Sequence, residues 1–420
     1  MKVLITSISF KVQLAKAFKK AGWEVYTHDC NQLNSELHSS YHHFISPRTN
    51  DPDYASFLLK FCQKYQIDLL VPTRDGELCP FLLLKNSLES MGTKVLVSNE
   101  CQRITNKQLM LERLDQLQII DTPKTYHLET SLDKVKYPLF IKPIHGQASQ
   151  DLHLIQTSYE LAIWLREHKP HEYLIQEYLD PTEWIEYSID TLYDFESNLV
   201  GAIPRKRQLV HNGESQITTI DLLPGAQEKM RLLGLEFALI GHNVIQVFVK
   251  DDQMKMIEIN PRFGGASNLA IQGGLDSPKI LLMMLHKFTL KNLQEQFKPV
   301  QGLKMIRHSF DRFYLEGQNY ISKDPKILCF DMDGTICSEK GLGYDTEEVY
   351  PQIRDKIQFL YDQGHQILVF TARGVKSGND WKPLVKQQLD AWKVPYHRII
   401  DRKPFADYYI DNKGIDVLDF

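Results

Sequence analysis

The chain has 420 residues, of which 43% are hydrophobic and 24% are charged, and its formal net charge is −4. A chain of this length favours about two to four domains, and the composition is typical of a folded globular protein. The weak negative charge argues against a nucleic-acid-binding surface spread over the molecule, and no apolar stretch reaches the roughly 18 residues of a membrane span. Neither the six cysteines nor the fifteen histidines show the spacing of a disulfide or metal framework. We therefore expect reduced thiols and scattered histidines in a cytoplasmic protein.

The first hundred residues alternate short apolar runs with amphipathic segments. This pattern predicts strands at 2–6, 23–27, 67–72 and 94–97, and helices at about 11–20, 53–65 and 76–90. Such alternation is typical of a parallel sheet with helices on both faces, which we expect to end near residue 102 as a Rossmann-like domain. No Gly-x-Gly-x-x-Gly fingerprint is present, so dinucleotide binding is not favoured. Met1–Ile8 is expected to be the first strand rather than a signal peptide, because its apolar run is short and lysines follow at once.

The pattern changes after residue 102. Short strands at 138–142, 174–177, 186–193 and 200–204 suggest an antiparallel meander within a domain of residues 103–310. Residues 311–325 are polar and irregular and are interpreted as a linker. Residues 326–420 return to strand–helix alternation and form the last predicted domain.

A constellation that suits magnesium lies in the central domain. Glu258 and Asn260 are two residues apart on a predicted strand, so their side chains point to the same face. Gln246 lies on the preceding strand, and a hairpin would bring its amide alongside. Oxygen ligands of this kind suit Mg²⁺, with phosphates completing the shell. Arg262, just beyond, adds a charge suited to a transferred phosphoryl group.

Weaker signals precede these strands: Lys107 and Lys142 in helix-start or strand-like settings, followed by Glu177 and Glu183. Together with the motif above, they resemble the ATP-grasp superfamily over about residues 1–310. The resemblance is to the carbamoyl-phosphate-synthetase-like branch. It implies that Lys107 and Lys142 contact the phosphates of ATP, that Glu177 and Leu179 meet the adenine, and that Glu183 meets the ribose.

The same resemblance implies that Gln246, Glu258 and Asn260 bind Mg²⁺, with Mn²⁺ as an alternative metal. Arg262, together with Arg205 or Arg207, would meet the transferred phosphate or an anionic substrate, although the latter two could instead form a solvated face. The sequence departs from the family after Lys142, where the loop keeps a single glycine, Gly146, beside Ala148 and Ser149. The phosphate contacts of this loop are therefore in question.

Paired carboxylates follow the first strand of the last domain. Asp331 and Asp333 are separated by one residue, and like charges this close require a cation or a shared proton. Mg²⁺ held between carboxylates and a substrate phosphate would meet this need. Thr371 follows the next predicted strand, and Lys403 and Asp411 lie near a third. Because ligands bind at the carboxyl ends of parallel strands, we expect these five side chains to meet in one crevice.

These motifs resemble the haloacid-dehalogenase (HAD) phosphatase superfamily over the whole last domain. The resemblance implies that Asp331 is the nucleophile that forms an aspartyl-phosphate and that Asp333 protonates the leaving oxygen and then activates water. Thr371 and Lys403 would hold the phosphoryl oxygens. Mg²⁺ would be bound by Asp331 and Asp411, with Asp333 in the same cluster. The segment between Ile336 and the next predicted helix, Cys337 to about Glu347, is too short for a cap domain, so the site would be open. The alternatives are aspartates that only cap turns, or a degenerate phosphatase.

The predicted fold is a multidomain α/β and α+β protein, with a Rossmann-like pre-ATP-grasp domain, an ATP-grasp domain and a capless HAD-like domain. Its predicted function is bifunctional: an ATP-dependent carboxylate–amine ligase acting through an acyl phosphate, and a magnesium-dependent phosphatase. The alternatives are an ATP-dependent bicarbonate or carbamate kinase with a phosphatase, and a nucleotide-sensing module that regulates a phosphatase. Expected partners are a small-molecule carboxylate and amine or a phosphorylated metabolite, with a homodimer as one assembly. Arg74, Asp75 and Glu77 are candidates to line the acceptor crevice, or to form a polar loop.

Overall fold

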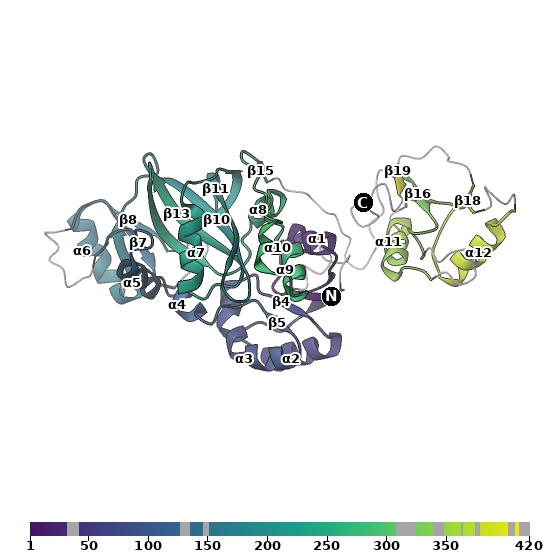
Figure 1. The fold of residues 1–420 in the computed structure, drawn as a ribbon, viewed down its shortest axis with the longest axis horizontal. Helices are drawn as coiled ribbons and strands as arrows, with labels where there is room; N and C mark the ends of the chain where they lie inside the picture. Colours follow the sequence, from purple (N-terminus) through teal and green to yellow (C-terminus); the bar gives the residue numbers. More distant parts are fainter. Residues whose placement is uncertain are drawn as a thin grey trace. The chain divides into compact units, whose positions relative to one another are not determined.

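The computed structural model describes residues 1–31, 42–126, 135–145, 151–307, 325–338, 348–362, 364–373, 379–401 and 408–410. The chain divides into two compact units, Met1–His308 and Ser309–Phe420 (Figure 1). Among the described residues, no helix is long and apolar enough to cross a membrane.

The first sheet of the larger unit is parallel, with the strand order β3-β2-β1-β4-β5. Its strands are β1 (Lys2–Ile5), β2 (Glu24–Asp29), β3 (His42–Ile45), β4 (Leu69–Val71) and β5 (Lys94–Val95), and its helices are α1 (Val12–Lys20), α2 (Tyr54–Tyr65) and α3 (Leu78–Ser90). Val3 and Ile5 share a core with α1, whereas Leu4 shares a second core with α2 and α3. Alternate residues of β1 therefore bury opposite faces, which confirms the predicted parallel sheet with helices on both sides. The strand expected at 94–97 ends at Val95, and β3 was not predicted.

A six-stranded antiparallel sheet forms the centre of this unit, with the order β14-β13-β10-β11-β12-β15. Its strands are β10 (Ile185–Tyr193), β11 (Leu199–His211), β12 (Glu214–Ile220), β13 (Gly241–Lys250), β14 (Gln253–Asn260) and β15 (Lys304–Ile306). Its helices are α4 (Cys101–Thr105), α5 (Lys107–Leu117), α7 (Ala226–Glu236), α8 (Ser267–Gln272), α9 (Ser277–Leu285) and α10 (Leu290–Gln294). Apolar residues of α5 and α7 share one core with β10 and β13, and residues of α8, α9 and α10 share another that includes α1. The shared core makes the first and second sheets one packed body.

A smaller antiparallel sheet has the order β6-β9-β7-β8. Its elements are β6 (Thr125–Tyr126), β7 (Leu139–Pro143), β8 (His153–Ile155), α6 (Ser158–Glu167) and β9 (Tyr173–Glu177). Leu161 and Trp164 of α6 pack on Leu139, Ile141 and Ile175 of the strands. The prediction of one antiparallel meander is wrong in this respect: the pairing is antiparallel, but β7 and β9 belong to this sheet and β10 and β11 to the central one. Strand propensity and spacing do not say which strands pair across an intervening helix.

The second unit contains a parallel sheet with the order β18-β17-β16-β19. Its elements are β16 (Ile327–Asp331), α11 (Pro351–Asp362), β17 (Gln366–Phe370), α12 (Lys382–Ala391), β18 (Arg398–Ile400) and β19 (Tyr408–Ile410). Phe330 and Val369 share a core with Ile357 of α11 and Leu389 of α12. The predicted strand–helix alternation is confirmed here. The predicted linker lies outside the described residues except for Pro325.

Candidate functional site

A cavity of about 470 Å³ opens in the larger unit, between the central sheet, β7 and the turn after β4. Six of the predicted site residues line it: Lys107, Lys142, Gln246, Glu258, Asn260 and Arg262. These residues come from four separate parts of the chain, so the fold brings together what the sequence shows only as separate motifs.

The acidic wall of the cavity is the β13–β14 hairpin. Gln246 pairs with Glu258, and Val244 pairs with Asn260, which confirms the predicted neighbourhood of the Gln246 amide. The Asn260 side-chain amide donates a hydrogen bond of 2.9 Å to Oε1 of Glu258. Three side chains with oxygen atoms therefore lie close together on the cavity wall, and this donor set fits Mg²⁺.

A β-bulge at Ile257 decides which way these side chains point. The ladder passes from Val247–Met256 directly to Gln246–Glu258, so Ile257 is the extra residue. Met254 and Met256 are buried on the core face before the bulge, and Ile259 is buried after it. The bulge shifts the alternation by one residue and so turns Glu258 away from the core and into the cavity.

The basic wall consists of two lysines with little solvent exposure. Nζ of Lys107, the first residue of α5, lies 3.9 Å from Oε2 of Glu258. Lys142 on β7 donates a hydrogen bond of 3.4 Å to the carbonyl of Ile257, the bulged residue. Burial lowers the pKa of Lys142 to about 8, Lys107 adds to this shift, and Glu258 opposes it. A phosphate placed between the two walls would stabilise the charged form of Lys142.

Arg262 lies just past β14 and joins the cavity to the first sheet. Its Nε and Nη2 donate to the two carboxylate oxygens of Asp75, at 2.6 and 2.8 Å, and Nη2 also reaches Oδ1 of Asn260 at 3.2 Å. Burial alone would lower the pKa of Arg262, but the Asp75 carboxylate raises it. The pair thereby fixes the guanidinium in its charged form beside the predicted metal ligands.

The turn after β4 lines the cavity with Arg74 and Asp75, as expected. Glu77 does not line it, and this part of the prediction is wrong. Glu77 is 1% exposed and accepts hydrogen bonds from Oγ of Ser7, at 2.8 Å, and from the backbone N–H of Thr73, at 3.1 Å. Burial raises the pKa of Glu77. Its hydrogen bonds hold the turn in place, and its side chain does not face the cavity.

Arg205 and Arg207 on β11 both line the cavity, and each is already paired. Nε of Arg205 donates to Oδ2 of Asp190 at 2.6 Å, and Arg207 forms an ion pair with Glu186. Asp190 is fully buried, and its other oxygen accepts a hydrogen bond of 2.5 Å from Oγ of Ser267. Desolvation raises the pKa of Asp190, but Arg205, His242 and Ser267 together outweigh it, so the net shift is downward.

A buried histidine completes this network, which the sequence analysis missed. Nε2 of His242 lies 2.9 Å from Oδ1 of Asp190, and its Nδ1 lies 2.8 Å from Oγ of Ser277. Asp190, His242 and Ser267 belong to no recognisable sequence motif. Asp190 could have been noticed because it is a charged residue within an otherwise largely apolar strand.

The residues predicted to hold the adenosine do not line this cavity. Glu177 forms an ion pair with Lys255 and accepts a hydrogen bond of 2.9 Å from the backbone of Lys124. Glu183 pairs with Lys250 at 2.5 Å, and Leu179 is buried. Their assignment to adenine and ribose stays a prediction. Gly146, Ala148 and Ser149 lie outside the described residues.

The second candidate site lies at the carboxyl ends of β16 and β17. Asp331 is the last residue of β16 and pairs with Phe370, so Thr371 follows at the neighbouring strand end. Thr371 is 1% exposed. The structure thus brings Asp331, Asp333 and Thr371 to one edge of the sheet, whereas Lys403 and Asp411 lie outside the described residues.

Arg373 is the residue of this second site that the sequence analysis did not assign. Its Nε lies 3.0 Å from Oδ1 and 2.9 Å from Oδ2 of Asp333, and Nη1 donates to Oε1 of Gln388 at 2.7 Å. Arg373 is 5% exposed, so this is a largely buried ion pair. Its place two residues after Thr371 could have suggested a partner for the paired carboxylates.

Family models match two parts of the larger unit. The one described as "PylC-like, N-terminal domain" matches residues 3–96, and the one described as "ATP-grasp in the biosynthetic pathway with Ter operon" matches residues 169–307.

Two curated proteins and one solved structure complete the comparison. The chain is 24% identical over 280 residues to the carbamoyl phosphate synthase large chain of Methanosphaerula palustris, over 60% of this chain and 26% of that protein. It is 30% identical over 93 residues to the polynucleotide 3'-phosphatase ZDP of Arabidopsis thaliana, over 21% of this chain and 12% of that protein. The biotin carboxylase domain of Hydrogenobacter thermophilus 2-oxoglutarate carboxylase, a dimer in complex with MgADP, ADP and bicarbonate, matches with a TM-score of 0.57 at 14% identity, over 71% of this chain and 72% of that one.

The larger unit therefore has a mixed α/β ATP-grasp fold with a PylC-like N-terminal domain. Residues 169–307 match an ATP-grasp family model, and the chain is similar to a carbamoyl phosphate synthase large chain and, in fold, to a biotin carboxylase domain. It spans about a quarter of the length of the curated synthase it matches, and the likeness to the solved structure, at low identity, concerns the fold.

Proposed function

We propose that the larger unit is an ATP-dependent carboxylate–amine ligase that acts through an acyl phosphate. The observation that carries this proposal is the cavity in which Lys107 and Lys142 face Glu258 and Asn260. Phosphate oxygens need cations, and Mg²⁺ needs oxygen ligands, so an Mg²⁺–triphosphate group would satisfy both walls together. The similar biotin carboxylase domain binds MgADP, which agrees with this assignment.

The side chains would divide the work as follows. Gln246, Glu258 and Asn260 hold Mg²⁺, which supplies neutralisation of the charge on the transferred phosphoryl group. Lys107 and Lys142 bind the phosphates and orient the γ-phosphorus toward the acceptor. An acceptor carboxylate oxygen then attacks this phosphorus, ADP leaves, and an amine attacks the acyl carbon and releases phosphate.

Arg262 is placed to stabilise the charge that develops during this transfer. Its guanidinium contacts Asn260 at 3.2 Å and is fixed by Asp75, so it needs no rearrangement to meet an anion at the metal. Arg74 and Lys11 line the same cavity from the first sheet and provide positive charge for an acceptor carboxylate. The acceptor would therefore bind between the turn after β4 and the metal strands.

A second candidate for this unit is phosphorylation of bicarbonate or carbamate. It is favoured by the similarity to a carbamoyl phosphate synthase large chain and by the bicarbonate in the similar biotin carboxylase complex. Both reactions consume ATP at the same cavity and differ in the acceptor. Bicarbonate-dependent ADP formation without any added organic carboxylate would select this candidate.

The test of the ligase follows ADP and phosphate separately while the protein is incubated with ATP, Mg²⁺ and pools of carboxylates and amines. Glu258→Gln keeps the shape of the cavity wall but removes a metal-binding charge, and it should abolish acceptor-dependent ADP formation. The matched control is Glu228→Gln, at an exposed position of α7, which should leave the rate unchanged. Unchanged ADP formation in Glu258→Gln contradicts the assignment, and ATP binding without turnover by the unchanged protein would favour a sensor.

We propose further that the second unit is a magnesium-dependent HAD phosphatase. Asp331, Asp333 and Thr371 at the ends of neighbouring parallel strands support this proposal, as does the similarity to a phosphatase. Asp331 would attack the phosphorus and form an aspartyl-phosphate, which water then hydrolyses. Because both oxygens of Asp333 are held by Arg373, one of them has to be freed before Asp333 can donate a proton.

The phosphatase test uses p-nitrophenyl phosphate, phosphorylated metabolites and a 3'-phosphorylated oligonucleotide, the last because of the relative's name. Asp331→Asn should remove Mg²⁺-dependent phosphate release, whereas Asp355→Asn on the exposed side of α11 should not. Phosphate release that persists in Asp331→Asn would disprove the assignment of the nucleophile. A homodimer, suggested by the dimeric biotin carboxylase, is checked in the same preparation by its mass in solution.

A further inference from the structure

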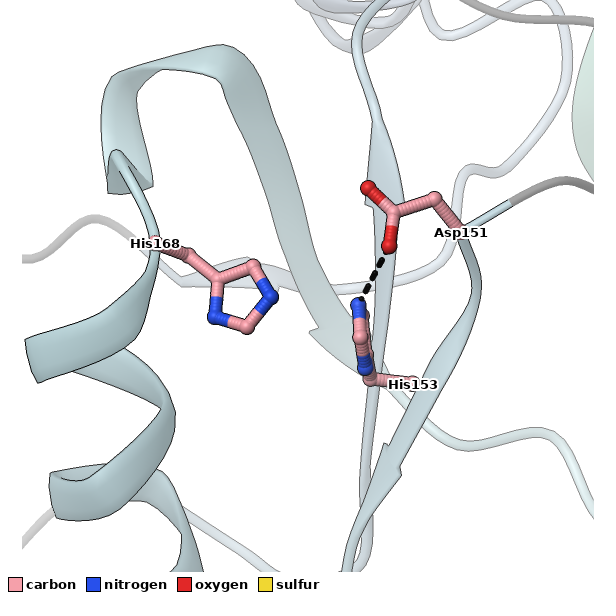
Figure 2. Close-up of side chains that lie close together, drawn as sticks. All are labelled: Asp151, His153 and His168. Atoms are coloured by element: carbon pink, nitrogen blue, oxygen red, sulfur yellow. Dashed lines mark hydrogen bonds and ion pairs between the residues drawn. The ribbon is translucent and has the colours of Figure 1, made fainter.

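A cluster of metal-binding side chains lies in the smaller sheet of the first unit, and none of its three residues lines the cavity, although Leu152 between two of them does. Asp151, His153 and His168 each offer one ligand atom, and these atoms lie within 4.8 Å of one another (Figure 2). His153 is the first residue of β8, Asp151 precedes it by two residues, and His168 caps the C-terminal end of α6. The cluster therefore spans a strand and the end of the helix that packs on it.

The first two residues already contact one another. Nε2 of His153 lies 2.8 Å from Oδ1 of Asp151. The other oxygen of Asp151 accepts a hydrogen bond from the hydroxyl of Tyr173, the first residue of β9. These two hydrogen bonds fix the orientation of the Asp151 carboxylate beside the His153 ring.

The orientation of His168 is set by its own helix. Its Nδ1 lies 3.0 Å from the carbonyl of Trp164, and because a carbonyl can only accept, Nδ1 is the protonated nitrogen. Nε2 of the neutral ring then carries the lone pair. Figure 2 shows this ring turned toward the Asp151–His153 pair. A ring hydrogen bond to a backbone carbonyl is the usual support of a histidine that binds a metal.

The surroundings also favour a bound cation. The His168 ring stacks on the indole of Trp164, with centroids 4.6 Å apart and an interplanar angle of 7°, so the ring cannot swing freely. Its position at the C-terminal end of α6 places it where unpaired carbonyls favour positive charge. Asp151 and His168 thus each have a hydrogen-bond partner outside the cluster, the Tyr173 hydroxyl and the Trp164 carbonyl.

We propose that Asp151, His153 and His168 bind one divalent transition-metal ion, Zn²⁺ in the first place. Two imidazole nitrogens and one carboxylate oxygen form a ligand set typical of Zn²⁺, and a water molecule would take the fourth position. In a tetrahedral site with bonds of about 2 Å the ligand atoms lie about 3.3 Å apart, so small side-chain rotations close the cluster around the ion. The ion would join the start of β8 to the end of α6.

This site differs in chemistry from the proposed Mg²⁺ sites, and none of its three ligands lines the cavity of the first unit. Mg²⁺ prefers oxygen ligands, whereas two of these three ligands are nitrogens. The sequence analysis expected scattered histidines, because a residue pair followed by a single histidine fifteen positions later matches no metal motif. The competing interpretation is an ordinary Asp151–His153 ion pair beside an unrelated histidine.

The test uses the full chain, stripped with a chelator and then titrated with Zn²⁺ in the presence of excess Mg²⁺ and ADP, which occupy the phosphate sites. Competition with a chromogenic chelator should show one tightly bound Zn²⁺ per chain. His168→Gln, His153→Gln and Asp151→Asn should each weaken binding by about 10- to 100-fold or more. The control is His171→Gln, three residues beyond His168 and largely exposed, which should bind Zn²⁺ as the unchanged protein does.

Thermal melting supplies a second readout. Zn²⁺ should raise the melting temperature of the unchanged protein and of His171→Gln, and not that of His168→Gln. Far-ultraviolet circular dichroism of the metal-free variants checks that each variant is folded. If a histidine variant does not fold, Asp151→Asn, at an exposed position, tests the site in its place. Equal Zn²⁺ affinity in all variants, or binding weaker than millimolar in the unchanged protein, would overturn the proposal.

Discussion

The two candidate phosphate sites of this chain hold their charged side chains in opposite ways. In the larger unit, Lys142 and Glu258 belong to facing walls of a cavity, and Lys107 approaches Glu258 no closer than 3.9 Å. In the second unit, Asp333 is held directly by Arg373, whose Nε contacts both carboxylate oxygens. The first arrangement leaves room for a charged ligand between the groups, whereas the second already pairs them.

The difference shows how each fold manages buried charge. A cavity wall can hold like charges together when the opposite wall and an incoming ligand offset them. Burial, with a smaller contribution from Lys107, lowers the pKa of Lys142 and makes its charge sensitive to such a ligand. At the sheet edge of the second unit, the charge of Asp333 is balanced directly by Arg373. We therefore expect ligand binding to depend on charge in the first site and on the release of an ion pair in the second.

The largest expected effect concerns the buried ion pair between Asp190 and Arg205 at the wall of the cavity. Asp190→Ala would leave Arg205 buried without its partner, and we expect the larger unit to lose about 3–5 kcal/mol of unfolding free energy. Urea denaturation followed by tryptophan fluorescence measures this loss. Glu228→Gln, which removes the exposed pair with Arg231, is the comparison and should change little. Equal effects of the two variants would show that the Asp190 pair is not the buried support of the cavity.

The next effect tests whether the open cavity depends on charge. Lys142→Met should weaken MgATP binding by about 10- to 100-fold, since a hydrogen bond to a charged group contributes about 1.5–3 kcal/mol. Isothermal titration calorimetry provides the affinity. Lys291→Met, at an exposed position of α10, serves as the control and should bind as the unchanged protein does. An affinity that does not change in Lys142→Met argues that the phosphates lie elsewhere.

A smaller effect is expected from weakening the ion pair between Arg373 and Asp333. Arg373→Lys keeps a positive charge but cannot contact both oxygens of Asp333, so one oxygen is freed more easily and phosphate release should become faster by about tenfold, mainly in kcat. Steady-state kinetics with p-nitrophenyl phosphate separate kcat from KM. Lys393→Arg, at an exposed position after α12, is the control. A slower reaction in Arg373→Lys would mean that the ion pair orients Asp333 rather than restrains it.

The smallest effect is the pH dependence of the open site. The pKa of Lys142, about 8, lies below its usual range, so the free protein loses this charge between about pH 7 and 9. MgATP affinity should therefore fall over this window, by up to about tenfold, and Lys142→Arg should remove the fall because arginine stays charged.

Stability should respond with the opposite sign. Above the folded pKa of Lys142, about 8, and below its higher unfolded pKa, the unfolded chain binds more protons than the folded one. The cost of burying this ammonium is therefore present below that window and is relieved as the pH rises through it. Affinity and stability that both fall over this range in the unchanged protein but not in Lys142→Met would contradict the assigned direction.

The sequence predicted the positions of most strands and the residues of the open site, because local patterns and motif spacing determine both. It could not predict the bulge at Ile257, which is a property of how β13 and β14 pair. Without that extra residue, Glu258 would share a face with Met254 and Met256 and point into the core. The motif marked Glu258 as a candidate ligand, and only the pairing shows why it faces the cavity.

The missed residues share one physical reason. Arg373 and Asp190 contact partners 40 and 52 positions away in the chain, Asp333 and His242, and such contacts leave no local periodicity to recognise. The assignment of β7 and β9 to a separate sheet failed for the same reason. Long-range pairing depends on packing of the whole unit, which composition and spacing describe only in part.

The most direct test of the central claim is a crystal structure of the full chain with MgADP. The account predicts that the diphosphate lies in the 470 Å³ cavity, with oxygens within hydrogen-bonding distance of Lys142 and with Mg²⁺ bound by Glu258 and Asn260. A nucleotide bound outside this cavity, or one that contacts neither Lys142 nor Glu258 through its phosphates or metal, would contradict it.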